Sequence, residues 1–96
     1  MTVRDKSGRK RYIAVILTPL PQGRMEAIRA IEASMENAMY MKAQVRFIYM
    51  QDGVAVVRCN HTFVSDVVRA LNYDRGTHSM RTVGTSGTIK ALRAML

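Results

Sequence analysis

Apolar β-forming runs alternate along this chain with stretches whose apolar residues recur at helical spacing. Residues 11–18 (RYIAVILT) are apolar at both odd and even positions, which predicts a central strand covered on both faces. Residues 44–50 and 54–59 predict two more strands, and the Asp52-Gly53 pair between them is typical of a tight hairpin turn. A fourth strand is expected over residues 77–83.

Two longer segments follow the helical period. After the break at residues 18–21, apolar residues three and four positions apart predict a helix over residues 22–42. Asn60 is a suitable N-cap for a second helix, which should end near residues 73–76. Its apolar stripe has i, i+3, i+4, i+7 spacing and consists of Val64, Val67, Val68 and Leu71.

Residues 83–90 (VGTSGTIK) should join the last strand to a short terminal helix. Gly84 permits backbone angles that other residues avoid, and Ser86 or Thr85 is expected to cap the helix. Ile89, Leu92 and Leu96 would then share one helical face. Free N–H groups at a helix start bind anions, so this stretch is a candidate phosphate-binding segment. An ordinary strand–turn–helix cap is the alternative.

The element order β-α-β-β-α-β predicts an α+β fold of the ferredoxin-like, RNA-recognition-like type. Right-handed crossovers place the fourth strand beside the first, then the third and the second, in one antiparallel sheet with an extra C-terminal helix. We expect a flexible basic arm over residues 1–10 and a single domain over residues 11–96. In this topology the start of the first strand meets the ends of the third and fourth strands.

The charge of the chain lies at its two ends. The formal net charge is +8, with 15 Lys and Arg residues against 7 Asp and Glu. Residues 1–11 hold five basic residues and one acid, and residues 75–96 hold four basic residues and no acid. The segment between them is balanced. Because the predicted topology brings the two ends together, they should form one positive field that suits a polyanion.

The residues expected to contact RNA lie in these converging segments. Arg11, Arg58 and two residues of the terminal helix are the first candidates for phosphate contacts. The full set is Arg9, Lys10, Arg11, Arg58, Asn60, Arg81, Ser86, Gly87, Thr88, Lys90 and Arg93. Valines stand in the third strand where RNA-recognition folds carry stacking aromatic rings, so base stacking on the sheet is not expected.

One face of the predicted sheet is apolar and needs a cover. Some of the apolar strand residues must point away from the two main helices, and either the terminal helix or a partner protein should cover them. The partner-binding candidates are Ile13, Val15, Ile48, Met50 and Val57. A double-faced first strand left uncovered would favour association of the isolated protein.

Several classes of site find little support in the sequence. His61, His78 and Cys59 lack the spacing of a zinc site, so structural roles are expected for all three. The acids lie among balancing bases, which argues against a two-metal nuclease, and no nucleophile–His–carboxylate pattern is evident. A lone cysteine fits a reducing compartment, and the apolar runs are too short for a membrane span.

Three motifs resemble the archaeal ribonuclease P protein component 2 family. They are residues 11–14 (RYIA), residues 58–60 (RCN) and, most specifically, residues 83–90 (VGTSGTIK). The resemblance implies a non-catalytic subunit of the ribonucleoprotein that removes 5′ leaders from precursor tRNA. In that family the RNA carries the chemistry with bound magnesium, and the protein binds no cofactor of its own.

The same resemblance implies the partners. They are the ribonuclease P RNA, a TIM-barrel protein subunit and, indirectly, precursor tRNA, in an assembly that includes a homodimer or heterotetramer in the cytoplasm, away from membranes. Family members have a longer, glycine-containing connection between the first helix and the second strand, whereas residues 39–43 here pass almost directly into the strand. The alternative function is a dimerising ferredoxin-like module that binds a small molecule or a protein.

Overall fold

The computed structural model describes residues 9–72 and 78–96. A four-stranded antiparallel sheet has the strand order β2-β3-β1-β4, which confirms the predicted ferredoxin-like topology. The elements are β1 (Lys10–Thr18), α2 (Arg24–Ala33), α3 (Asn37–Lys42), β2 (Arg46–Gln51), β3 (Val54–Asn60), the short 3₁₀ helix η1 (His61–Phe63), α4 (Val64–Leu71), β4 (Ser79–Ser86) and α5 (Ile89–Met95).

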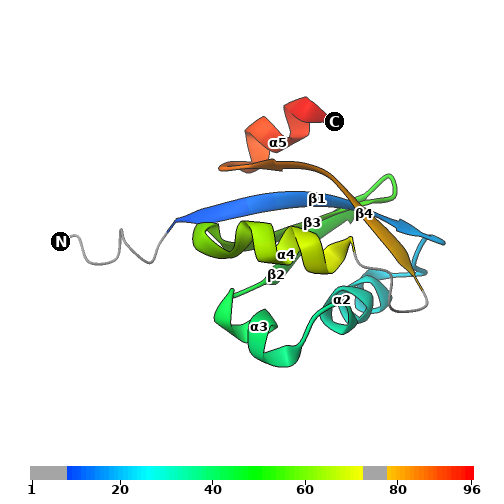
Figure 1. Ribbon diagram of the computed structural model, residues 1–96. Coiled ribbons are helices and arrows are strands. Elements are labelled where there is room, and N and C mark those ends of the chain that lie inside the picture. The colour runs from blue at the N-terminus through cyan, green and yellow to red at the C-terminus, as the bar shows by residue number, and fades with distance from the viewer. Residues whose placement is uncertain (1–8, 73–77) are drawn as a thin grey trace.

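The sheet is the middle layer of three. Figure 1 shows α2, α3 and α4 on one side of the sheet and α5 alone on the other. The larger buried cluster lies between the sheet and α2 and α4, and it includes Ile13, Val57 and Leu71. On the α5 side, Leu92 packs on Ala14 and Val56 in a much smaller cluster. The terminal helix therefore covers part of the apolar face that the sequence left without a cover.

β1 is the central strand, as predicted, and neighbouring residues along it are buried on opposite faces. Ile13, Ala14 and Val15 are all fully buried. Ile13 and Val15 belong to the cluster under the main helices, whereas Ala14 belongs to the cluster under α5. Strand side chains alternate between faces, so this continuous apolar run supplies both cores.

The hairpin between β2 and β3 follows the expected turn. Asp52 and Gly53 both have positive φ angles, 54° and 81°, as a two-residue hairpin turn with the right-handed twist of a sheet requires. Gln51 pairs with Val54 across this turn. The predicted hairpin is confirmed.

The helix predicted over residues 22–42 is two helices, which corrects that prediction. α2 ends at Ala33, and α3 begins at Asn37. The Ser34 hydroxyl donates to the Ile31 carbonyl at 2.6 Å and is buried. Such local bonds compete with helix continuation. The break turns the chain so that buried Met35 joins the core, and Ala43–Val45 lead from α3 into β2.

β4 is longer than predicted, and the turn comes later. Gly84 pairs with Ala14, and Ser86 pairs with Tyr12, so these two residues belong to the strand. The cap is also different: Thr88 precedes α5, and its hydroxyl accepts from the Ala91 N–H at 3.1 Å. The expectation that Ser86 or Thr85 caps the helix was therefore wrong.

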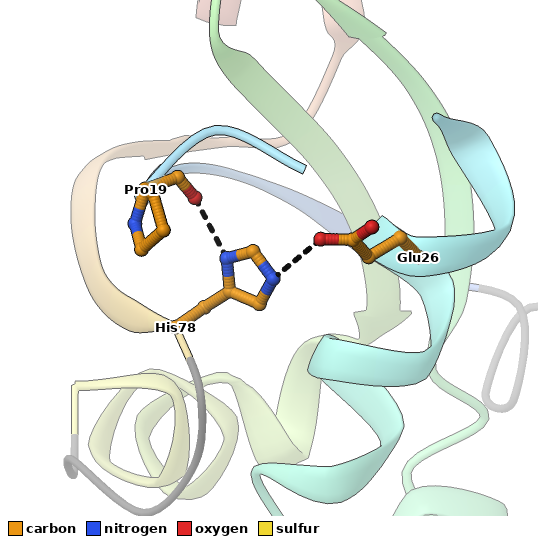
Figure 2. Close-up of polar contacts among 3 residues, drawn as sticks. All are labelled: Pro19, Glu26 and His78. Carbon is orange, nitrogen blue, oxygen red and sulfur yellow. Dashed lines mark hydrogen bonds and ion pairs between the residues drawn. The ribbon is translucent and has the colours of Figure 1, made fainter. Parts of the chain in front are cut away.

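A buried histidine ties the start of β4 to α2. In Figure 2, His78 points between the chain after β1 and the first turn of α2. Its Nδ1 lies 2.7 Å from the Pro19 carbonyl oxygen, and its Nε2 lies 2.9 Å from a Glu26 carboxylate oxygen. This arrangement is structural, as the sequence indicated.

Some expectations fall on residues that the structure does not describe. Residues 1–8 of the predicted arm and the predicted helix end at residues 73–76 lie outside the described ranges. Lys10, counted with the arm, is the first residue of β1. Within the described ranges, every helix is too short to cross a membrane.

Candidate nucleic-acid interface

Three segments that are distant in sequence meet at one end of the sheet. Lys10 pairs with Asn60 and Arg11 with Cys59, so the start of β1 lies beside the end of β3. On the other side of β1, Tyr12 pairs with Ser86 at the end of β4. We call this part of the molecule the basic end. The observed strand order brings these three segments together, so the predicted convergence is confirmed.

The basic end is hollowed on one side. An open hollow of about 500 Å³ is lined by Arg9, Lys10, Arg11, His61, Val64 and Gly87. Gly87 lies close to the Arg11 guanidinium, since a methyl group there would be in ordinary contact with a terminal nitrogen, at 3.7 Å. Three of the six lining residues are basic, so the hollow suits an anionic group but does not select a particular one.

Lys10 is held in place by two amide oxygens. Its ammonium donates to the side-chain oxygens of Asn60 and Gln44, each at 2.7 Å. The Asn60 oxygen is therefore engaged with Lys10, and its side chain makes no capping bond to η1. An ammonium has three donors, so one remains for a ligand. Gln44 has a φ of 55°. The sequence did not indicate its contact with Lys10, because that contact depends on the turn before β2.

The candidates at the basic end lie on different faces of the sheet. Arg11 is opposite Cys59, whose side chain packs under the main helices. Arg58 is opposite Tyr12, which packs on the α5 side. The two arginines therefore flank the sheet and do not form one flat patch. Arg46, which sequence reasoning missed, lies opposite Arg58.

Three candidates lie close to the start of α5. Ser86 and Thr88 form a small hydroxyl turn, in which the Ser86 oxygen accepts from the Thr88 N–H at 3.4 Å. Thr88 then caps α5, and Lys90 is exposed in the first turn. This segment adds the exposed ammonium group of Lys90 to the basic end.

Two candidates lie elsewhere, which corrects their expected placement. Arg81 lies near the start of the outer strand β4 and pairs with Ile16, toward the end of the sheet opposite the basic end. Arg93 lines a second hollow, of about 330 Å³, beside the β2–β3 hairpin with Asp52 and Leu96. Both arginines are thus separated from the basic end, because β4 begins at the far end of the sheet and α5 leads back toward the β2–β3 hairpin.

The expected partner-binding residues also need correction. Ile13, Val15 and Val57 are fully buried beneath the main helices, and Met50 packs against the same cluster. Ile48 alone of the set packs on the α5 side. The buried residues present no surface to a partner. Leu96, expected to pack with Ile89 and Leu92, has an exposed fraction of 57%.

Cys59 lies under the basic end but is shielded from it. Burial raises the pKa of its thiol to about 11, while Lys10 and Arg11 act in the opposite direction. A thiol in this state is protonated at neutral pH and unreactive. Among the described residues, no cluster of three or more His, Cys, Asp and Glu could hold a metal ion.

The fold has a counterpart in a known assembly. A chain in a cryo-EM structure of yeast ribonuclease MRP matches with a TM-score of 0.65 at 12% sequence identity, covering 83% of this chain and 75% of that one. No protein-family model matches the chain, and no curated protein matches its sequence. At this identity, the likeness establishes that the two chains share the ferredoxin-like fold.

Proposed function

We propose that this protein is an RNA-binding subunit of a ribonucleoprotein of the ribonuclease P and ribonuclease MRP type. The observation that carries the proposal is the fold match to a chain of yeast ribonuclease MRP over 83% of the residues. The sequence resemblance to ribonuclease P protein component 2 supports the same class independently. The task of the present protein would be to hold the catalytic RNA that removes 5′ leaders from precursor tRNA.

The distribution of charge supports RNA as the ligand. The N-terminal basic residues Arg9, Lys10 and Arg11 line the hollow, and Gly87, which precedes α5, completes its wall. Fixed cations on a rigid sheet end favour binding to a phosphate backbone without base recognition. The RNA, with its own magnesium, would carry the chemistry, and the protein would act with a TIM-barrel subunit in the cytoplasm.

The alternative, a dimerising module, has weaker support. It requires an uncovered apolar sheet face, and α5 places Leu92 on the centre of that face. A heterotetramer of the proposed complex would therefore form through other surfaces.

The direct test combines capture and salt titration. Immobilised protein should retain ribonuclease P RNA together with the TIM-barrel subunit. If about six phosphates are neutralised, the affinity for the RNA should fall by roughly three decades between 50 and 200 mM salt. An affinity that barely changes over this range would contradict the electrostatic basis of the proposal.

A matched pair of variants localises the contact. Arg11→Gln should lower the salt slope by about one unit, the loss of one phosphate contact. Arg29→Gln is the control, since Arg29 is exposed on α2, on the charge-balanced part of the chain. Both variants should melt at wild-type temperatures. Equal weakening by both would place the RNA elsewhere or make the charge effect diffuse.

A further inference from the structure

Two arginines lie directly opposite each other on the α5 side of the sheet. Arg46 of β2 is paired with Arg58 of β3. Directly opposed like charges destabilise a sheet. Within the described ranges, the ion pairs are Arg69–Asp66 and His78–Glu26, so neither arginine forms an ion pair with a described acid.

A β-bulge creates this pair. Next to the hairpin, Gln51 pairs with Val54 and Tyr49 pairs with Val56. If this pairing continued without interruption, Arg46 would lie opposite Cys59, on the helix side of the sheet. Instead, the register shifts between Phe47 and Tyr49. The extra residue moves Arg46 to the other face, beside Arg58. Bulges often re-aim a side chain at a functional position.

Arg58 carries an unmet hydrogen-bonding requirement. Its Nε is buried and has no hydrogen-bond partner among the described residues, so this donor is available to a water molecule or an anion. The half-buried stem also restricts the motion of the guanidinium, so less freedom is lost when it binds. Arg46, in contrast, is exposed and accessible.

A third cation stands diagonally across from this pair. Lys10 pairs with Asn60, two residues beyond Arg58 on the same face of β3. Its ammonium is fixed by Asn60 and Gln44. The Tyr40 phenol lies near Arg46 and is neutral at physiological pH, because burial and the Glu32 carboxylate raise its pKa while Arg46 lowers it. Glu32 is therefore an acid close to this neighbourhood, and it makes no ion pair with Arg46.

We propose that Arg46 and Arg58, with Lys10 beside them, form a binding site for a single phosphate group of RNA. The inference rests on the proposed function and deepens it. Guanidinium groups bind phosphate through parallel N–H donors, and one phosphate can accept from both arginines. Lys10 and Arg11 also line the hollow at the end of the sheet, so the RNA backbone would pass across the basic end, from the arginine pair to this hollow.

The first test uses the free protein and inorganic phosphate. Phosphate at five times its dissociation constant should raise the Tm by roughly 4–8 °C over sodium chloride of equal ionic strength. Arg46→Gln should lose most of this shift, and Arg29→Gln should keep it. Without phosphate, Arg46→Gln should melt no lower than the wild type, because it removes a repulsion. The same phosphate response in Arg46→Gln would overturn the inference.

Acetate distinguishes phosphate from carboxylate as the ligand. Sodium acetate at equal ionic strength should give the wild type little stabilisation. If acetate stabilises it as much as phosphate does, and Arg46→Gln abolishes both shifts, the pair is a docking point for an acidic protein segment, and the RNA assignment is wrong.

The second test uses the RNA and separates this inference from the proposed function. Arg46→Gln and Arg58→Gln should each lower the salt slope by about one unit, and the double variant should also lower it by about one, because the two residues share one phosphate. Wild-type RNA binding with an unchanged Arg46→Gln slope would refute the shared site and leave the function standing. No RNA binding, with the phosphate shift intact, would refute the function and keep the anion site.

Discussion

The two faces of the sheet are built from the same strands but are covered very differently. On one face, α2 and α4 pack over a continuous core that contains the large side chains of Ile31 and Leu71. On the other, the seven-residue α5 places Leu92 over Ala14 and Val56 in a small cluster, with a hollow left beside the β2–β3 hairpin. Buried apolar area is the main source of folding free energy, so the first face contributes most of the stability of the fold and the second contributes less.

The largest loss of stability is expected from a substitution in the core under the main helices. Leu71→Ala removes a fully buried side chain and should lower the free energy of unfolding by about 4 kcal/mol. Urea denaturation should show a lower midpoint with an unchanged slope. A loss of less than about 1 kcal/mol would mean that the core closes around the vacated space.

The corresponding change on the other face should cost less and act locally. Leu92→Ala should cost about 3 kcal/mol, since α5 is exposed on its outer side and can relax toward the sheet. Hydrogen exchange should show that α5 amides lose protection while those of β1 and β3 keep it. Equal loss of protection throughout would show that the two faces unfold as one unit.

The two contacts of His78, with Pro19 and Glu26, can be compared with each other on the helix side of the sheet. His78→Ala leaves the Pro19 carbonyl and the Glu26 carboxylate without their ring partner and should cost about 2 kcal/mol. Glu26→Gln is the matched variant. It should cost less, because the Glu26 side chain is 45% exposed and water replaces the contact. A larger effect from Glu26→Gln would reverse this ranking of the two bonds.

The smallest expected effect is a pH dependence. Burial raises the pKa of Cys59 from an ordinary 9.0 to about 11, so the folded state favours the protonated thiol. The stabilisation is complete below pH 9 and is lost as pH rises toward 11. Between pH 8 and 10, the wild type should lose about 1 kcal/mol more than Cys59→Ala. Parallel pH profiles for the two proteins would contradict the shift.

The sequence predicts the topology well because strong local signals agree with global rules. The double-faced run of β1, the Asp52-Gly53 turn and the right-handed crossovers leave one arrangement, and that arrangement brings Arg11 to the end of β3. These features depend on residue types that occupy a few backbone states. The basic end was therefore predictable even though its side-chain contacts were not.

The errors come from features that packing decides. Ser34 breaks a helix whose apolar period continues past it. Thr88 caps α5 in place of Ser86 because β4 extends three residues further than its apolar run. The bulge that places Arg46 opposite Arg58 leaves no mark in the residue pattern. Each of these choices depends on neighbours distant in sequence, so a local pattern cannot specify it.

The two β-bulges have a consequence for how copies of this protein meet each other. One shifts the register of β2, and the other that of β4, beside Val83. These are the two outer strands of the sheet. A bulge bends and twists the outer backbone, so its free N–H and C=O groups no longer match a straight strand of another molecule. The two bulges therefore disfavour edge-to-edge association of sheets from different copies of this protein at high concentration.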